Sequence, residues 1–307
     1  MRIVVALGGN ALLQRGQPMT AEAQVKNVRV AAAALAELAR DHQIVVAHGN
    51  GPQVGLLALQ GAAYAPDAPW PLDVLGAETE GMIGYLIEQE LMNALPEGAQ
   101  CATLLTRVEV AADDPAFQAP TKPIGPVYAK TEADAVVKAH GWAMIEEASG
   151  HLRRVVPSPL PLRILSVDAI KLLMGDGQTV ICAGGGGIPV VRGTDGMMKG
   201  VEAVIDKDRT AALLAQELQA DALLLLTDVP AVFRDFGSAS QSAIGNTTPL
   251  ELGSLDLAAG SMGPKVSAAC AFVKDSGMRA GIGQLSDALA ILEGRKGTLI
   301  LPDPATA

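Results

Sequence analysis

The sequence has few aromatic residues, few cysteines and no long apolar run. Aromatic residues make up 3% of the 307 residues, so the stacking surfaces that bind single-stranded nucleic acid are scarce. The longest apolar stretches are far shorter than the roughly 20 residues that a membrane-spanning helix needs. The three cysteines, Cys101, Cys182 and Cys270, show no paired spacing, and we expect them to be reduced thiols. The sequence therefore predicts no membrane span and no disulfide framework.

Basic residues are also in deficit. The chain has 23 Lys and Arg against 33 Asp and Glu, which gives a formal net charge of −10. A broad basic face for nucleic acid is therefore not expected, although a few lysines and backbone N–H groups can still bind a small anion. No signal peptide precedes the first apolar run, so we expect a cytoplasmic protein.

What is abundant is apolar residues and glycine. Hydrophobic residues make up 49% of the chain and 33 residues are glycine, which excludes intrinsic disorder and provides a sizeable core. Short apolar runs alternate with longer helical patterns, which is typical of an open, largely parallel α/β sheet covered on both faces. The expected strands are 3–7, 44–47, 101–110, 179–183, 222–227 and 298–301. The expected helices are 20–40, 74–93, 167–173, 207–218 and 265–276.

Two segments depart from this alternation. Residues 113–161 are rich in proline and charge, and we expect them to form an insertion that stands off the main sheet. Residues 236–248 predict a surface loop or a small hairpin.

Three glycine clusters each follow an expected strand directly. They are Gly8-Gly9-Asn10, Gly49-Asn50-Gly51 and the run Gly184 to Gly187. The carboxyl ends of parallel strands meet at one edge, where open α/β proteins bind ligands, and glycine lets backbone N–H groups approach an anion closely. A single cluster is equally consistent with a tight turn, but three clusters at three strand ends favour an anion-binding crevice.

Familiar nucleotide and metal motifs are missing. The sequence has no G-x-x-x-x-G-K-[ST] motif of P-loop proteins. Gly49, Gly51 and Gly55 are spaced G-x-G-x-x-x-G, which differs from the dinucleotide fingerprint. The four histidines share no ligand spacing, so we expect no dedicated zinc site, and any metal would be Mg²⁺ carried by nucleotide phosphates.

Three lysines lie next to helix starts or rigid loops. Lys207 stands between Asp206 and Asp208 at an expected helix start, Lys265 follows Met262-Gly263-Pro264, and Lys122 lies in the proline-rich insertion. Each alone is more typical of a solvated surface. Together with anion-binding loops, they supply the fixed positive charge that phosphoryl transfer needs.

These motifs resemble those of carbamate kinases in the amino acid kinase superfamily. The resemblance rests on residues 4–11 and 48–55, on the proline-rich motif at 120–126, on Arg153-Arg154, and on residues 184–190, 201–208 and 260–265. The matching motifs run in order along essentially the whole chain. The insertion that carries Lys122 is what separates this family from acetylglutamate, aspartate and uridylate kinases.

The resemblance implies a three-layer αβα sandwich around a mainly parallel eight-stranded sheet, with a protruding subdomain at about 113–161. It implies an N-terminal lobe (1–175) for carbamate or carbamoyl phosphate and dimerisation, and a C-terminal nucleotide lobe (176–307). The implied reaction is ATP + carbamate ⇌ ADP + carbamoyl phosphate with Mg²⁺. The implied enzyme is a homodimer, and in catabolic settings its reaction runs toward ATP.

The resemblance also implies roles for individual residues. Lys207 and Lys265 would stabilise the transferring phosphoryl group, Asp208 would orient them, and Lys122 would reach the carbamate side. The residues that would cradle substrate and phosphates are Gly8, Gly9, Asn10, Gly49, Asn50, Gly51, Gly184, Gly185, Gly186 and Gly187. The residues that would border the nucleotide are Thr227, Asp228, Val229, Met262, Gly263 and Lys265.

The sequence departs from the family pattern at two places. Glu80 stands where many carbamate kinases have Gln, which puts an extra carboxylate near the expected dimer helix or the site. The stretch Glu147-Ala148-Ser149-Gly150-His151 replaces an Asp-Ala-Gly-Arg-Gly-like motif in the subdomain. Two alternatives therefore stay open: a non-catalytic, regulatory relative of the amino acid kinases, and a kinase for another small carboxylate.

Overall fold

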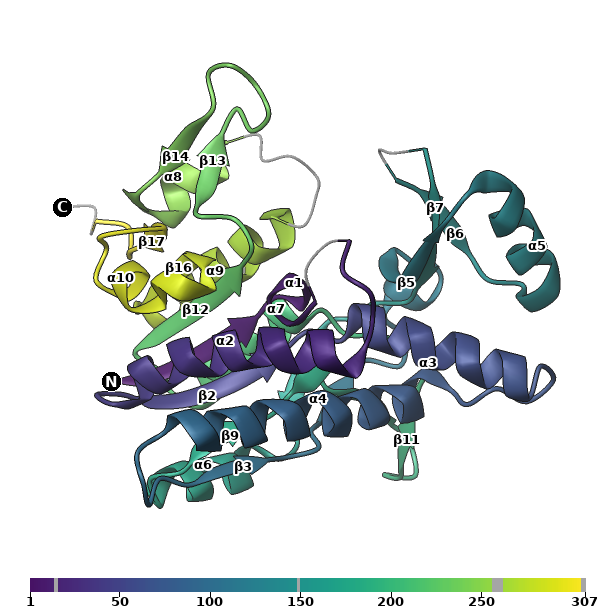
Figure 1. Ribbon diagram of the computed structural model, residues 1–307, viewed down its shortest axis with the longest axis horizontal. Helices are drawn as coiled ribbons and strands as arrows, with labels where there is room; N and C mark the ends of the chain where they lie inside the picture. Colours follow the sequence, from purple (N-terminus) through teal and green to yellow (C-terminus); the bar gives the residue numbers. More distant parts are fainter. Residues whose placement is uncertain (14–15, 148–149, 256–261, 305–307) are drawn as a thin grey trace.

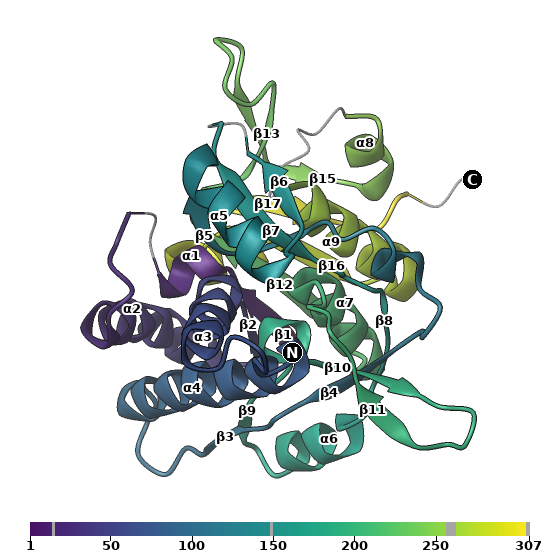
Figure 2. The ribbon, with the colours of Figure 1, turned by 90° about the vertical axis from the view of Figure 1, so that its right-hand side faces the viewer.

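An eight-stranded, mainly parallel sheet forms the centre of the molecule (Figures 1 and 2). The computed structural model describes residues 1–13, 16–147, 150–255 and 262–304. Neighbouring strands of the sheet pair in parallel except β16 with β17, which are antiparallel. The strands, in sheet order, are β15 (Asn246–Thr247), β17 (Thr298–Ile300), β16 (Arg279–Gln284), β12 (Ala222–Thr227), β1 (Arg2–Leu7), β2 (Gln43–His48), β9 (Thr179–Ile181) and β3 (Cys101–Thr103).

Helices cover both faces of this sheet and complete three layers. The central strand β1 shows why: Ile3, Val5 and Leu7 face one apolar cluster, while Val4 and Ala6 face the other. A strand buried on both faces reads as a continuous apolar run, which is what the sequence shows. The helices on the first face are α1 (Gly9–Leu12), α2 (Ala21–Ala39), α4 (Leu72–Ala94) and α10 (Ala288–Leu292). Those on the second face are α6 (Val167–Gly175), α7 (Lys207–Glu217), α8 (Pro249–Gly253) and α9 (Met262–Ser276).

The expected insertion is a separate small unit that stands beside the main sheet (Figure 1, teal). Its three-stranded antiparallel sheet has the order β5-β7-β6, and α5 lies against it. The elements are η1 (Pro115–Phe117), β5 (Lys122–Tyr128), α5 (Lys130–His140), β6 (Met144–Glu146) and β7 (Leu152–Val156).

This protruding subdomain, which we define as residues 113–161, docks on α3 (Gly51–Tyr64) by close backbone contact. A methyl group on Gly55 of α3 would lie only 1.9 Å from the Cα atom of Gly125 in β5. Gly125 also has a φ of +70°, which glycine adopts without strain. Ile124 of β5 and Val54 of α3 share one apolar cluster beside this contact. The glycine pair therefore lets the subdomain pack directly against the main body.

Two smaller sheets complete the fold. One has four strands in the order β11-β10-β4-β8, and the other is a two-stranded hairpin of β13 and β14. The hairpin covers the first part of the segment expected as a loop or hairpin at 236–248, whereas residues 246–247 form β15 at the edge of the main sheet. The strands are β4 (Arg107–Val110), β8 (Pro161–Ile164), β10 (Ile188–Arg192), β11 (Met198–Gly200), β13 (Val232–Arg234) and β14 (Ser242–Ile244).

The fold class expected from the sequence is confirmed, but two expectations about strands are wrong. Residues 101–110 do not form one strand, because the chain leaves the main sheet after Thr103 and enters the four-stranded sheet at Arg107. Between them, the N–H group of Thr106 donates to the side chain of Glu80 at 2.9 Å rather than to a strand. The second error is an omission: β16 was not expected, since Gly281 and Gly283 interrupt its apolar pattern.

The proposed two-lobe division stays a prediction. Strand β9, which begins just beyond residue 175, lies between β2 and β3 of the N-terminal part. No helix within the described residues is both long and apolar enough to span a bilayer.

Candidate active site

The first two glycine clusters meet at the carboxyl ends of β1 and β2. Gly8 donates its N–H to the Leu226 carbonyl at 2.8 Å, and Gly49 donates to the Leu7 carbonyl at 3.0 Å. A methyl group on Gly49 would lie 3.0 Å from the Gly9 nitrogen and 3.5 Å from the Cε atom of Lys207. The expected convergence of the clusters is therefore present, and it lies against one of the expected lysines.

Asn10 and Asn50 occupy different positions at this edge. Asn10 lies in α1, and its side chain falls outside the described part of the chain. Asn50 precedes the first turn of α3, which begins at Gly51, and its buried amide donates to the Thr79 hydroxyl at 2.9 Å. The start of α3, where backbone N–H groups lack intrahelical partners, therefore lies at the same edge as the glycine clusters.

The third cluster is a buried turn. A methyl group on Gly184 would lie 2.4 Å from the ring of His48, and one on Gly185 would lie 2.1 Å from the amide nitrogen of Asn50. The N–H groups of Gly186 and Gly187 donate to the Ala183 and Gly184 carbonyls. Because those two amides are already engaged, Gly186 and Gly187 contribute the shape of the crevice, while Gly184 and Gly185 leave room for His48 and Asn50.

A buried carboxylate joins two of the expected lysines. Asp208 Oδ1 accepts from Lys207 Nζ at 2.5 Å, and Asp208 Oδ2 accepts from Lys265 Nζ at 2.8 Å. Asp208 is 4% exposed and Lys265 is 7% exposed. Lys207 and Asp208 come from the start of α7 and Lys265 from the first turn of α9, so the packing of these two helices brings the three groups together.

The electrostatics of this trio follow from its burial. Burial alone would raise the pKa of Asp208, but the two ammonium groups outweigh it and hold that pKa well below its usual range. Burial lowers the pKa of Lys207, against the attraction of Asp208 and with the repulsion of Lys265. The pKa of Lys265 is raised, because Asp208 outweighs its burial. Two ammonium groups with one carboxylate leave a net positive charge in a poorly solvated place, which attracts an anion.

Lys122 reaches this region from the protruding subdomain. Its Nζ atom donates to Asp206 Oδ2 at 2.5 Å. Asp206 is the N-cap of α7, and its Oδ1 accepts from the N–H groups of Asp208 and Arg209 at 3.0 and 3.2 Å. Lys122 is thus joined to the helix that carries Lys207 and Asp208.

Of the expected nucleotide-binding residues, Thr227 lies next to the first cluster. A methyl group on Gly8 would lie 3.5 Å from the Cα atom of Thr227, which ends β12. The Thr227 hydroxyl donates to Asp228 Oδ1 at 3.1 Å, and Val229 follows in the same loop. Met262 and Gly263 begin α9, in the same first turn as Lys265. Gly260 and Ser261 of that motif fall outside the described residues, as do Ala148 and Ser149 of the altered subdomain motif.

A buried polar group behind the third cluster had no expected role in the site. Glu80 of α4 is 2% exposed, and its Oε2 accepts from the Thr106 N–H at 2.9 Å. The Thr106 hydroxyl accepts from the Ala183 N–H at 2.9 Å, next to the glycine turn. Burial raises the pKa of Glu80 to about 8 and lowers that of His48 to about 4. Only the departure from the family motif at Glu80 singled this residue out in the sequence.

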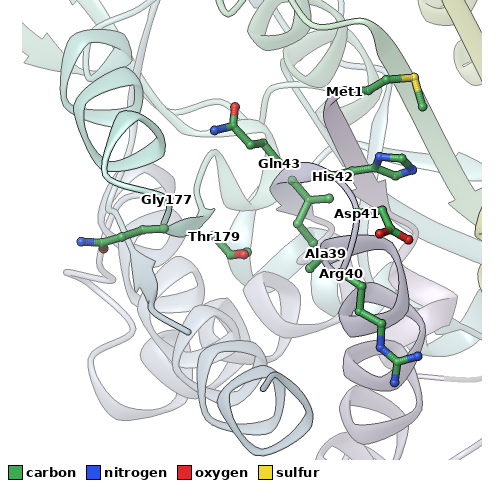
Figure 3. A pocket seen from close by; sticks show the side chains of 10 residues that line it. Met1, Ala39, Arg40, Asp41, His42, Gln43, Gly177 and Thr179 are labelled. Carbon is green, nitrogen blue, oxygen red and sulfur yellow. The ribbon is translucent and has the colours of Figure 1, made fainter. Parts of the chain in front are cut away.

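A polar cavity of about 380 Å³ lies at the opposite edge of the sheet (Figure 3). It is lined by Met1, Gln43 and Thr179, where β1, β2 and β9 begin, and by the end of α2 at Ala39 and Arg40. It contains none of the expected site residues. Within the described ranges, no group of three or more His, Cys, Asp or Glu side chains could hold a metal ion.

Comparisons with known proteins agree with this geometry. A model of the Amino acid kinase family matches residues 1–284. The chain is 55% identical over 302 residues to the carbamate kinase of Rhizobium meliloti (strain 1021), covering 98% of this chain and 93% of that protein. It is 52% identical to the carbamate kinase of Escherichia coli (strain K12), covering 97% and 98%. Among solved structures, Giardia lamblia carbamate kinase bound to AMP-PNP superposes with a TM-score of 0.88 at 39% identity, covering 98% of each chain.

Proposed function

Because the chain belongs to the amino acid kinase family, and within it to the carbamate kinases, we propose that it catalyses ATP + carbamate ⇌ ADP + carbamoyl phosphate. The observation that carries this proposal is the buried Lys207–Asp208–Lys265 trio beside the glycine loops. A net positive, poorly solvated cluster at the ligand-binding edge of an α/β sheet suits the transfer of an anionic group.

The reaction asks for positive charge and positioning rather than for a base. A carbamate oxygen attacks the γ-phosphorus of ATP, the bond from that phosphorus to the β,γ-bridging oxygen breaks, and ADP leaves. Carbamate is already an anion, so no proton has to be removed before the attack. The barrier comes from bringing two anions together in line, which lysines and oriented N–H groups lower.

The residues divide this work by their positions. Lys207 and Lys265, fixed by Asp208, would face the transferring phosphoryl group and the nucleotide phosphates. Lys122 would act from the subdomain on the carbamate side. The glycine loops at 8–10 and 49–51 would hold the substrate, and the turn at 184–187 would shape the crevice. Thr227, Asp228 and Val229, with Met262 and Gly263, would border the nucleotide.

Mg²⁺ would be bound mainly by the nucleotide phosphates. Mg²⁺ usually keeps several waters and binds through one or two carboxylates and the phosphates of a substrate. When bound, Mg²⁺ would neutralise part of the phosphate charge.

We further propose that the protein is a homodimer in the cytoplasm, where ATP and ADP are available. We propose that its reaction runs there toward ATP formation. Support for the dimer comes from Met82, Tyr85 and Met92, which are exposed apolar residues at helical spacing on α4. A dimer would elute at twice the mass of the chain in size-exclusion chromatography with light scattering, and a monomeric mass would contradict it.

The decisive experiment is ATP formation from ADP and carbamoyl phosphate, followed with hexokinase and glucose-6-phosphate dehydrogenase. Lys207→Ala should lower kcat by a factor of about 10² or more, since it removes a fixed charge at the phosphoryl group. A wild type that binds nucleotide without turnover would point to the regulatory relative. Turnover of another carboxylate, but not carbamate, in a substrate panel with ATP would point to a different kinase.

A further inference from the structure

We propose that Asp206 is a positioning residue that holds Lys122 over the site and thereby connects the protruding subdomain to the start of α7. This inference rests on the proposed function for its kinetic consequences, but its structural part can be tested without activity. The two carboxylate oxygens of Asp206 have separate roles. Oδ1 caps α7, whereas Oδ2 accepts from Lys122 Nζ at 2.5 Å.

The ion pair between Lys122 and Asp206 is largely shielded from solvent, so it can restrict the position of the Lys122 ammonium group. The side chain of Asp206 is 13% exposed and that of Lys122 is 29% exposed. Burial alone would raise the pKa of Asp206, but Lys122 outweighs this and keeps the pKa below its ordinary value. Lys122 has a long, flexible side chain, so a fixed carboxylate restricts where its ammonium group lies.

Other contacts join the same stretch of chain to the subdomain. The Val204 N–H donates to the Pro157 carbonyl at 2.9 Å. Arg154 of β7 pairs with Glu202 at 3.6 Å, and Glu202 Oε2 also accepts from the Leu72 N–H at the start of α4. Residues 201–206, which we call the linking segment, therefore contact the subdomain at three points immediately before Lys207.

This arrangement gives Asp206 a role that an ordinary helix cap lacks, because it links the position of the subdomain to that of Lys207. Displacement of the subdomain would pull on the linking segment, and Asp206, the residue directly before Lys207, would transmit that displacement to Lys207. In the other direction, a well-ordered α7 start fixes the carboxylate that holds Lys122. Docking of the subdomain and the placement of two catalytic lysines from different elements are thus joined at one side chain.

The test uses Asp206→Asn, which keeps an oxygen that can cap α7 and removes the charge that holds Lys122. We expect kcat/KM for carbamoyl phosphate to fall about 10- to 100-fold because a reacting group is misplaced, while KM for ADP stays within about twofold. Combined with Lys122→Met, the added effect of Asp206→Asn should vanish, since the residue acts through Lys122. A loss of the same size in the Lys122→Met background, or an unchanged kcat/KM in Asp206→Asn, would overturn the proposal.

Hydrogen exchange followed by mass spectrometry separates this proposal from the proposed function, because it requires no turnover. Asp206→Asn and Lys122→Met should each speed exchange in β5 and β7 by several-fold, without a further increase in the double variant. The matched control is Glu109→Gln, which removes a carboxylate paired with Arg163 on the four-stranded sheet and should leave β5 and β7 unchanged. Equal exchange in Asp206→Asn and wild type would refute the positioning role even if the wild type were inactive.

Discussion

Glu80 should make the stability of this protein fall as the pH rises, and Glu80→Gln should remove that effect. The carboxyl group is 2% exposed on α4. Its Oε2 accepts from the Thr106 N–H, while its Oε1 has no hydrogen-bond partner among the described residues. Burial raises its pKa from 4.5 to about 8, against the opposing effects of the Thr106 and Gly184 N–H groups. The folded protein therefore favours the protonated form of Glu80.

The sign and size of this pH dependence of stability follow from proton linkage. Between pH 4.5 and about 8 the folded state holds a proton that the unfolded state has lost, so the free energy of unfolding decreases with rising pH. Each pH unit in this window changes it by about 1.4 kcal/mol, or about 4 kcal/mol between pH 5 and pH 8. Glutamine has nearly the same shape and no proton to lose. From pH 5 to pH 8, the free energy of unfolding of Glu80→Gln should therefore rise by about 4 kcal/mol relative to that of wild type.

Urea unfolding at pH 5, 6, 7 and 8, on wild type and Glu80→Gln, measures this difference directly. His48 changes stability in the same range, because burial lowers its pKa to about 4 and stability falls as the pH drops from 6.5 toward that value. That contribution is common to both proteins and cancels in the difference. The matched control is Glu78→Gln, an exposed carboxyl on the same helix, which should leave the profile unchanged. Parallel pH profiles for wild type and Glu80→Gln would refute the reasoning.

Three further outcomes are expected. Asp208→Asn should leave two buried ammonium groups, including that of Lys207, without a counter-charge. We expect thermal unfolding to show that the free energy of unfolding falls by about 3–5 kcal/mol, and the coupled assay to show little ATP formation. Full activity would contradict the proposed role of Asp208. Gly55→Ala should push β5 away at Gly125 and raise KM for carbamoyl phosphate, whereas Gly61→Ala on the same helix, with no atom within 4 Å of the new methyl, should be neutral; equal kinetics for the two variants would count against the docking contact. Excess EDTA should abolish ATP formation and added Mg²⁺ should restore it, measured by direct chromatography of the nucleotides because the coupling hexokinase itself needs Mg²⁺; activity that persists in EDTA would exclude a role for the ion.

Local sequence patterns were enough to predict most of the architecture. Continuous apolar runs such as 222–227 mark strands buried on both faces, because such strands have no solvent side on which polar residues would alternate. Thr20 predicts the start of α2, where its hydroxyl accepts from the Ala23 N–H at 3.3 Å. The motifs also identified the family that the comparisons confirm. Strand β16 was missed because Gly281 and Gly283 interrupt its apolar run, and only its pairing with β12 and β17 identifies it as a strand.

The sequence by itself thus determined the α/β fold, the family and the residue types of the site, since these depend on short-range patterns and motif order. Only the tertiary structure decided which groups meet. Asp208 and Lys265 lie 57 positions apart in the sequence, yet the packing of α7 against α9 joins them in one ion pair. The pairing of Lys122 with Asp206 and the burial of Glu80 depend in the same way on how distant elements pack. Contact and burial arise from the three-dimensional arrangement of the whole chain, and it is this arrangement that turns a set of charged residues into a site.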